Sequence, residues 1–78
     1  SLGWALFKLK KYDESKKYLQ TAVTLMPSDP IVNDHYGDVL WMKGKKIQAR
    51  YHWKYALNLE EAEKDLKKLI EKKLIKGL

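Results

Sequence analysis

The chain has 78 residues, enough for one small domain, and 45% of them are hydrophobic. It has no cysteine, which excludes disulfides and thiolate metal sites, and its apolar runs are far shorter than the roughly 20 residues that span a bilayer. The net charge of +6 divides into +3 over residues 1–27, zero over 28–61 and +3 over 62–78, nearly all of it from lysine. A solvated lysine-rich surface is the plainest interpretation, because nucleic-acid readers usually include arginine.

The first predicted element is a helix that is cut short at its start. Apolar residues from Leu2 to Leu9 recur at helical spacing, and Lys10-Lys11 predicts a turn. The chain opens inside this pattern without an initiator Met, so we expect it to be a piece of a longer protein. A second helix is predicted over residues 12–25. Its inward stripe comprises Tyr12, Ser15, Leu19, Ala22, Val23 and Leu25.

Two prolines mark the boundary between the second and third predicted helices. Pro27 ends the second helix, because the residue before a proline disfavours the helical conformation. Ser28 or Asp29 can cap the third helix, with Pro30 at its first position. This third helix is predicted over residues 30–42. Its buried stripe includes Val32, Tyr36, Val39 and Leu40.

Gly44 predicts a turn with a left-handed backbone, followed by a fourth helix over residues 46–59 and a fifth over 62–76. The inward residues of the fourth helix are Ile47, Ala49, Trp53, Ala56 and Leu57. Those of the fifth are Ala62, Leu66, Leu69, Ile70 and Leu74, with lysines opposite. Asn58 could cap the fifth helix with Glu61 as its reciprocal partner, although nothing in residues 58–61 forbids one continuous helix. We favour a break.

The sequence matches itself at an offset of 34 residues. The two residues of each matched pair are similar in size or are both apolar. The pairs are Leu2-Gly3 with Tyr36-Gly37, Leu6-Phe7 with Leu40-Trp41, Ser15 with Ala49, Leu19 with Trp53, Ala22-Val23 with Ala56-Leu57, and Leu25 with Leu59. A fixed period of this length is typical of a two-helix repeat that stacks on its neighbours.

Together these positions resemble the tetratricopeptide repeat. The family has a large apolar residue and Gly in the first helix, Tyr-Asp-Glu at the start of the second, small residues at its crossings and a closing Pro; here these are Leu2-Gly3, Tyr12-Asp13-Glu14, Ser15, Ala22 and Pro27. The resemblance implies an all-α fold of tandem antiparallel helix hairpins in a right-handed superhelix. Its parts are an incomplete first repeat (1–29), a second repeat (30–61) and a C-terminal capping helix (62–78).

The sequence departs from the family pattern at Asn33, where the family often has Trp, and at Glu61, where it has Pro. The stretch 29–53 also resembles C-terminal repeats of alphaproteobacterial tetratricopeptide proteins, exported or associated with the cell envelope.

By the same resemblance, the chain is expected to be a non-catalytic protein-interaction module. It would form the C-terminal part of a scaffold that binds a protein or peptide on its concave face. The expected lining residues are Trp4, Phe7, Lys8, Ile31, Asp34, Asp38, Trp41, Met42, Lys68 and Lys72. The carboxylates of Asp34 and Asp38 would favour a basic partner. Alternatively, Trp41 packs against the neighbouring repeat and both aspartates are solvated.

The family's two-carboxylate clamp for acidic chaperone tails needs Lys, Asn and Arg on this face. The corresponding positions here hold Asp34, His35, Asp38, Asp65 and Leu69. An acidic chaperone tail is therefore a poor candidate partner.

No constellation of residues predicts catalysis, and we expect neither an enzyme nor a bound cofactor. His35 and Asp38 have the i, i+3 spacing of a metal edge, but His52 is on another helix and two mixed ligands do not make a site. We interpret both histidines as structural.

Two alternatives to the interaction module remain open. The lysine-rich face of the last helix could bind nucleic acid, which we consider unlikely, or an anionic membrane surface; its members are Lys64, Lys67, Lys68, Lys72, Lys73 and Lys76. The chain could also associate with itself, because the short first helix leaves the surroundings of Trp4 and Phe7 uncovered.

Overall fold

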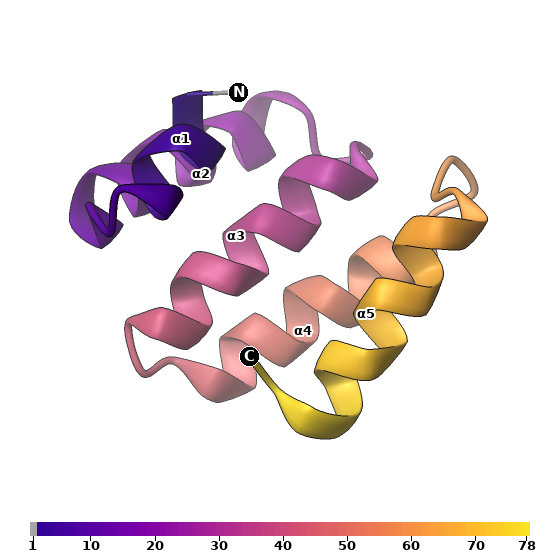
Figure 1. Ribbon diagram of the computed structural model, residues 1–78. Coiled ribbons are helices and arrows are strands. Elements are labelled where there is room, and N and C mark those ends of the chain that lie inside the picture. The colour runs from indigo at the N-terminus through magenta and orange to yellow at the C-terminus, as the bar shows by residue number, and fades with distance from the viewer. Residues whose placement is uncertain (1) are drawn as a thin grey trace.

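The computed structural model describes residues 2–78. Its elements are α1 (Leu2–Lys8), α2 (Tyr12–Leu25), α3 (Pro30–Met42), α4 (Lys46–Leu57) and α5 (Lys64–Lys76), with no strand among the described residues (Figure 1). Successive helices run back and forth as hairpins, and α5 packs onto the last of them. The predicted all-α architecture of tandem hairpins with a terminal helix is confirmed.

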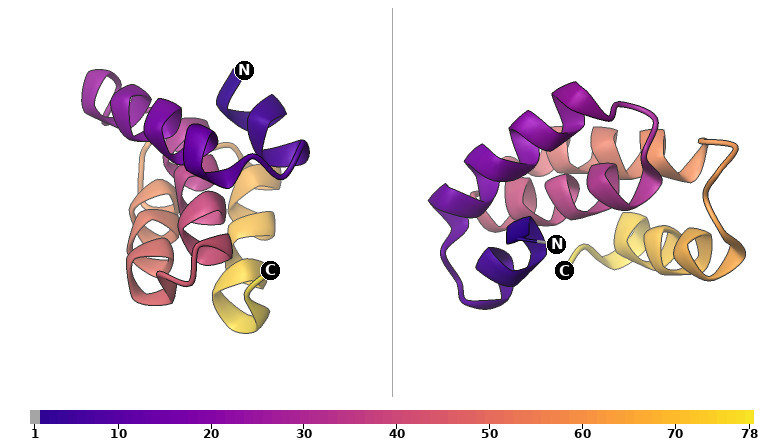
Figure 2. Two further views of the ribbon diagram at one scale, coloured as in Figure 1. Left: turned by 90° about the vertical axis from the view of Figure 1, so that its left-hand side faces the viewer. Right: turned by 90° about the horizontal axis from the view of Figure 1, so that it is seen from above.

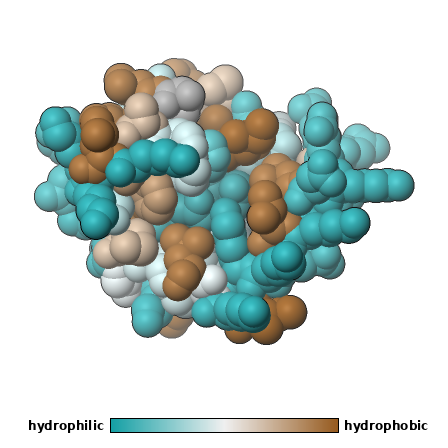
Figure 3. Space-filling model, in the orientation of Figure 1, coloured by the Kyte–Doolittle hydropathy of each residue, from teal (hydrophilic) through white to brown (hydrophobic). Residues whose placement is uncertain are grey.

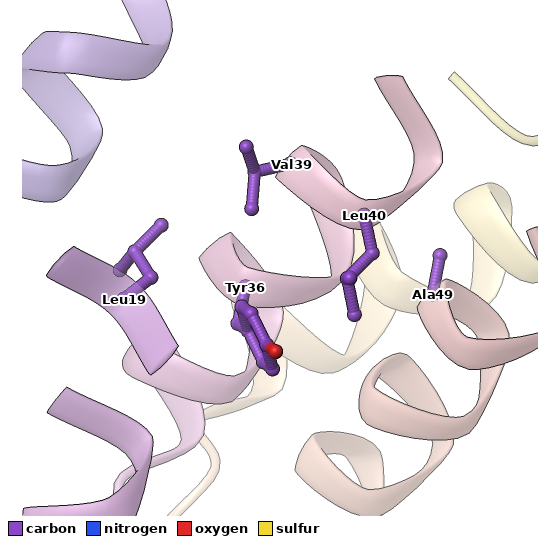
Figure 4. Packing of buried hydrophobic residues seen from close by; sticks show 5 residues of the cluster. All are labelled: Leu19, Tyr36, Val39, Leu40 and Ala49. Carbon is purple, nitrogen blue, oxygen red and sulfur yellow. The ribbon is translucent and has the colours of Figure 1, made fainter. Parts of the chain in front are cut away.

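α3 lies at the centre of the molecule. Figure 2 shows α1 and α5 on one side of it and α2 and α4 on the other. The first core cluster joins α2, α3 and α4; it comprises Leu19, Tyr36, Val39, Leu40 and Ala49 (Figure 4). A second cluster of Trp53, Ala56 and Ile70 joins α4 to α5. The first cluster thus packs α2 and α4 against the central α3, and the second packs α5 against α4.

The turn chemistry read from the sequence explains where the helices begin. The carboxylate of Asp29 accepts hydrogen bonds from the backbone N–H groups of Ile31 and Val32, at 2.9 and 3.2 Å, so Asp29 is the N-cap of α3. Pro30 occupies the first helical position, where a missing N–H costs nothing. Gly44 has φ 81°, the predicted left-handed conformation. The predicted bounds of α2 and α3 are confirmed.

The predicted break between α4 and α5 is also confirmed, but its chemistry differs from the expectation. Asn58 does not cap the following helix. It caps the end of α4, where its side-chain amide donates to the Lys54 carbonyl at 2.9 Å. Glu63, in an extended conformation, precedes α5 instead. Ala62 is buried and anchors the connecting loop.

Most predicted inward residues are buried or half-buried, and three are not. Leu25 is 74% exposed, Ile47 87% and Leu69 54%. Leu25 is the last residue of α2. Ile47 lies two residues before the buried Ala49, which places it on the opposite side of a helix with 3.6 residues per turn. Leu69 lies about 100° around α5 from the buried Ile70, which places it outside the packed side of the helix.

Candidate protein-interaction face

The predicted site residues all lie on α1, α3 and α5, which line one side of the molecule. We call this side the α1–α3–α5 face; it is turned toward the viewer in Figures 1 and 3. α1 carries Trp4, Phe7 and Lys8, α3 carries Ile31, Asp34, Asp38, Trp41 and Met42, and α5 carries Lys68 and Lys72. The fold therefore brings together the three helices that the repeat pattern placed on a common face.

Asp34 and Asp38 are not presented to solvent. They are only 3% and 2% exposed, and the Lys73 ammonium of α5 bridges them. Its Nζ lies 2.8 Å from Asp34 Oδ1 and 3.0 Å from Asp38 Oδ1. The indole N–H of Trp53 also donates to Asp38 Oδ1 at 3.0 Å. Both sequence expectations for these carboxylates are wrong: they are neither solvated nor available to a basic partner, because Lys73 occupies them.

The electrostatics of this buried group are those of two carboxylates that share one cation. Burial raises the pKa of Asp38 to about 6, and the neighbouring charge of Asp34 acts in the same direction against Lys73 and Trp53. Burial opposes the charge of Lys73, but Asp38 and Asp34 outweigh it and raise the pKa of the ammonium. Lys73 therefore stays charged and holds α5 against α3.

Lys73 was expected on the outer, lysine-rich side of the last helix, and this placement is wrong. The residue lies three positions after the buried Ile70, so it shares the inward side of α5. Spacing alone could have indicated this, because Leu66, Ile70 and Lys73 form one helical stripe. The two aspartates of α3 supply the charge that makes its burial tolerable.

The α1 end of the face is a cluster of stacked rings. The ring centroid of Trp4 lies 4.2 Å from that of His35 and 5.1 Å from that of Phe7, and the paired rings are nearly parallel. Lys8 Nζ lies 5.5 Å from the centre of the Trp4 ring. Burial lowers the pKa of His35, with smaller contributions from neighbouring charges, so its ring is neutral at neutral pH. His35 therefore acts as a structural aromatic contact. No group of three or more potential metal ligands occurs within residues 2–78.

Trp41 is mainly a packing residue. Its ring stacks on Trp53 with centroids 5.4 Å apart, and Lys46 Nζ lies 5.0 Å from its centre. The exposed apolar residues of α3 and α5 include Ile31 (55%), Met42 (45%) and Leu69 (54%). Lys8, Lys68 and Lys72 are also exposed. Figure 3 shows brown apolar patches on this face, separated by hydrophilic surface.

A buried amide that sequence reasoning did not place fixes the turn between α2 and α3. Asn33 Nδ2 donates to the carbonyls of Pro27 and Asp29, at 3.0 and 2.9 Å. Its Oδ1 lies 3.4 Å from His52 Nδ1. The only signal in the sequence was that Asn33 stands where the family often has Trp.

Comparison with known proteins agrees with the hairpin architecture. Residues 1–29 match the family model described as tetratricopeptide repeat. No curated protein and no solved structure matches the chain, so no relative supports the narrower resemblance to alphaproteobacterial proteins. None of the helices in the described part of the chain is both long and apolar enough to cross a membrane. Tetratricopeptide repeats are non-catalytic modules that generally mediate protein–protein interactions. Residues 1–29 are thus similar to a tetratricopeptide repeat, and the described chain has an all-α fold of helical hairpins consistent with that type.

Proposed function

We propose that the chain is a non-catalytic interaction module that docks a protein or peptide segment on the α1–α3–α5 face. The observation that carries this proposal is the exposed apolar surface of Ile31, Met42 and Leu69, contributed by two helices of that face. Exposed apolar groups rimmed by polar residues are typical of interaction sites. Trp4 and Phe7, which stack on each other and are half-buried, lie on the third helix of that face.

The burial of Asp34 and Asp38 changes the chemistry expected of the partner. With both carboxylates bound to Lys73, the exposed charged residues predicted for the site are Lys8, Lys68 and Lys72. We therefore propose a partner segment recognised mainly through apolar side chains, with hydrogen-bond acceptors facing the lysines. Well-packed apolar anchors supply most of the affinity in such interfaces.

The test is a selection of short random peptides against the folded chain. Peptides that dock on this face should bind the Met42→Ala/Leu69→Ala variant at least tenfold more weakly than the parent. A tenfold loss corresponds to about 1.4 kcal/mol of binding free energy. The Ile47→Ala variant is the matched control, because Ile47 is even more exposed but lies on α4, away from this face. Circular dichroism should show unchanged helix content in both variants.

Selected peptides that bind the double variant and the parent equally well would show that the partner docks elsewhere. The alternative of an anionic surface makes a different prediction, because binding through exposed lysines weakens steeply as salt is raised. Salt-sensitive binding to a short oligonucleotide or to acidic vesicles, abolished by changing Lys68 and Lys72 to Gln, would favour that alternative.

A further inference from the structure

The opposite side of the molecule carries two adjoining hollows between α2 and α4. We call the first, of about 220 Å³, the polar hollow; it is lined by Lys16, Gln20, Tyr36, Leu40, Lys45, Gln48 and His52. The second, of about 200 Å³, is the aromatic hollow, lined by Val23, Pro27, Asn33, Tyr51, His52 and Tyr55. His52 borders both hollows, so they lie side by side, and we call the pair the α2–α4 groove. Tyr36, Leu40 and Asn33 of α3 provide its floor. Figure 2 shows α2 and α4 flanking α3 on this side.

The polar hollow presents donors and positive charge. Lys16 and Lys45 stand in its wall, no acidic residue lines it, and neither ammonium has an ion-pair partner in the part of the chain that the structure describes. Gln20 and Gln48 add amide donors from α2 and α4. Lys16 is half-buried, so part of its side chain is already ordered. A carboxylate is the protein group that this set of donors fits best.

The aromatic hollow has the opposite character. Tyr51 is 63% exposed and Tyr55 40%, and their rings stack with centroids 6.4 Å apart. Val23 and Pro27 complete its apolar wall. The amide nitrogen of Asn33 is already bonded to two backbone carbonyls, so little hydrogen-bonding capacity remains on that side. Partly exposed tyrosines are common anchors in protein interfaces, because they combine an apolar body with a polar tip.

The junction between the two hollows is fixed in place. The His52 ring packs edge-on against Tyr36, with centroids 4.7 Å apart, and against Tyr51, at 5.2 Å. Burial lowers the pKa of His52, so the ring is neutral at neutral pH. A groove whose central side chain is held by packing is preorganised, which reduces the entropy lost when a ligand binds.

We propose that the α2–α4 groove binds an extended acidic segment of a protein partner, with carboxylates in the polar hollow and a proline or aliphatic side chain in the aromatic hollow. This site lies on the other side of α3 from the face described under the proposed function and goes beyond it. Gln48 and Tyr55 are seven residues apart on α4, about 10 Å at the rise of a helix. An extended chain covers that distance in about three residues. The segment therefore carries its apolar residue about three positions from its acidic pair.

The test uses an array of synthetic peptides, each with a pair of glutamates and one leucine or proline at a spacing that varies from one to six residues. The best spacing should be near three, and replacing both glutamates by glutamine should weaken binding at least tenfold. The Lys16→Gln/Lys45→Gln variant should show the same loss. The Lys68→Gln/Lys72→Gln variant, with the same change in net charge on the opposite side, should bind as the parent does. Tyr51→Ser should weaken binding, whereas Ile47→Ser, on the same helix but outside both hollows, should not.

Three outcomes would overturn the proposal. One is that no peptide of the array binds the parent chain. Another is that binding is lost in the α5 lysine variant and retained in the Lys16→Gln/Lys45→Gln variant, which would assign the acidic peptide to the α1–α3–α5 face. The third is that a short oligonucleotide binds more tightly than every peptide and is displaced by none of them, which would identify the groove as a nucleic-acid site. The first two results leave the proposed function standing, because its test depends on the Met42→Ala/Leu69→Ala variant, and neither residue lines the α2–α4 groove.

Discussion

At the scale of single residues, the most consequential side chain is Lys73. It is the only cation that contacts the two buried carboxylates of α3 in the described structure, and it reaches them from a different helix. Removing one partner of a buried ion pair leaves the others without compensation for their lost hydration. The polar part of the contact between α5 and α3 therefore depends on a single charge.

We expect Lys73→Met to lower the free energy of unfolding by about 3 kcal/mol, although methionine fills a similar volume. The exposed Lys72 is the control, and Lys72→Met should change stability by less than about 0.5 kcal/mol. Urea denaturation followed by circular dichroism measures both. Equal stability of the two variants would mean that the buried pair contributes nothing.

The titration of Asp38 predicts an unusual pH dependence. Its pKa in the folded state, about 6, lies above the ordinary value of 3.8, so between these values the folded protein binds this proton more tightly than the unfolded chain does. The contribution of Asp38 to stability therefore increases as the pH falls through 6 and is lost as the pH rises through 6. His35 and His52, with lowered pKa values, act in the opposite direction and destabilise the fold on acidification.

Comparison with Asp38→Asn isolates this contribution, because the variant keeps both histidines. The free energy of unfolding of the parent, minus that of the variant, should increase by about 2 to 3 kcal/mol between pH 7 and pH 4. Urea titrations at several pH values measure it. A difference that stays constant or decreases on acidification would mean that the carboxyl is charged throughout.

At the scale of the helices, the contact between α3 and α4 depends on the absence of a side chain at Gly37. A Cβ atom at this position would lie 2.5 Å from both Cδ1 and Nε1 of Trp53, which is fully buried and hydrogen-bonded to Asp38. The indole has no room to retreat in a close-packed interior.

We expect Gly37→Ala to lower the midpoint of thermal unfolding more than Gly44→Ala. Gly44 has open space around its Cα but φ 81°, so alanine there costs only about 1 to 2 kcal/mol of backbone strain. Gly37→Ala combines a steric clash with displacement of Trp53, and such overpacking costs about 1 to 3 kcal/mol or more. The opposite order would mean that α3 and α4 can separate without cost.

The helices themselves were largely predictable from the sequence, because their boundaries depend on local chemistry. Pro27 and Pro30 restrict the backbone wherever they occur, and Gly44 permits the left-handed turn after α3, so the bounds of α2 and α3 follow from them. The site was less predictable. Trp4, Phe7 and Ile31 could be assigned to a common face, but the burial of Asp34 and Asp38 depends on a lysine 35 to 39 residues away. Periodicity within one helix carries no information on such a partner.

At the scale of the whole molecule, α5 covers the apolar edge that α4 would otherwise expose. Ile70 is fully buried, and Leu66 and Leu74 pack against the second cluster. The Arg50 guanidinium of α4 donates a hydrogen bond to the Leu74 carbonyl near the end of α5. The helix therefore acts as a cap within its own chain.

We expect the chain to sediment as a monomer of 9.2 kDa over a concentration series up to about 100 μM. Self-association through the surroundings of Trp4 and Phe7 predicts a mass that rises with concentration. If it does rise, Leu2→Ser on the exposed side of α1 should restore the monomer, whereas Ile75→Ser near the end of α5 should not. Sedimentation velocity distinguishes these outcomes.

The fluorescence of Trp53 can be used to follow the attachment of α5. On excitation, electron density in an indole moves from the pyrrole nitrogen toward the benzene ring. The Asp38 carboxylate 3.0 Å from that nitrogen stabilises the excited state, and Lys73 Nζ lies 5.9 Å from the ring centre. Detachment of α5 removes the positive charge and admits water, so the emission maximum shifts. When Trp4 and Trp41 are replaced by Phe, Trp53 is the one remaining tryptophan. Its emission maximum would then report the docking of α5 in real time, without an attached dye.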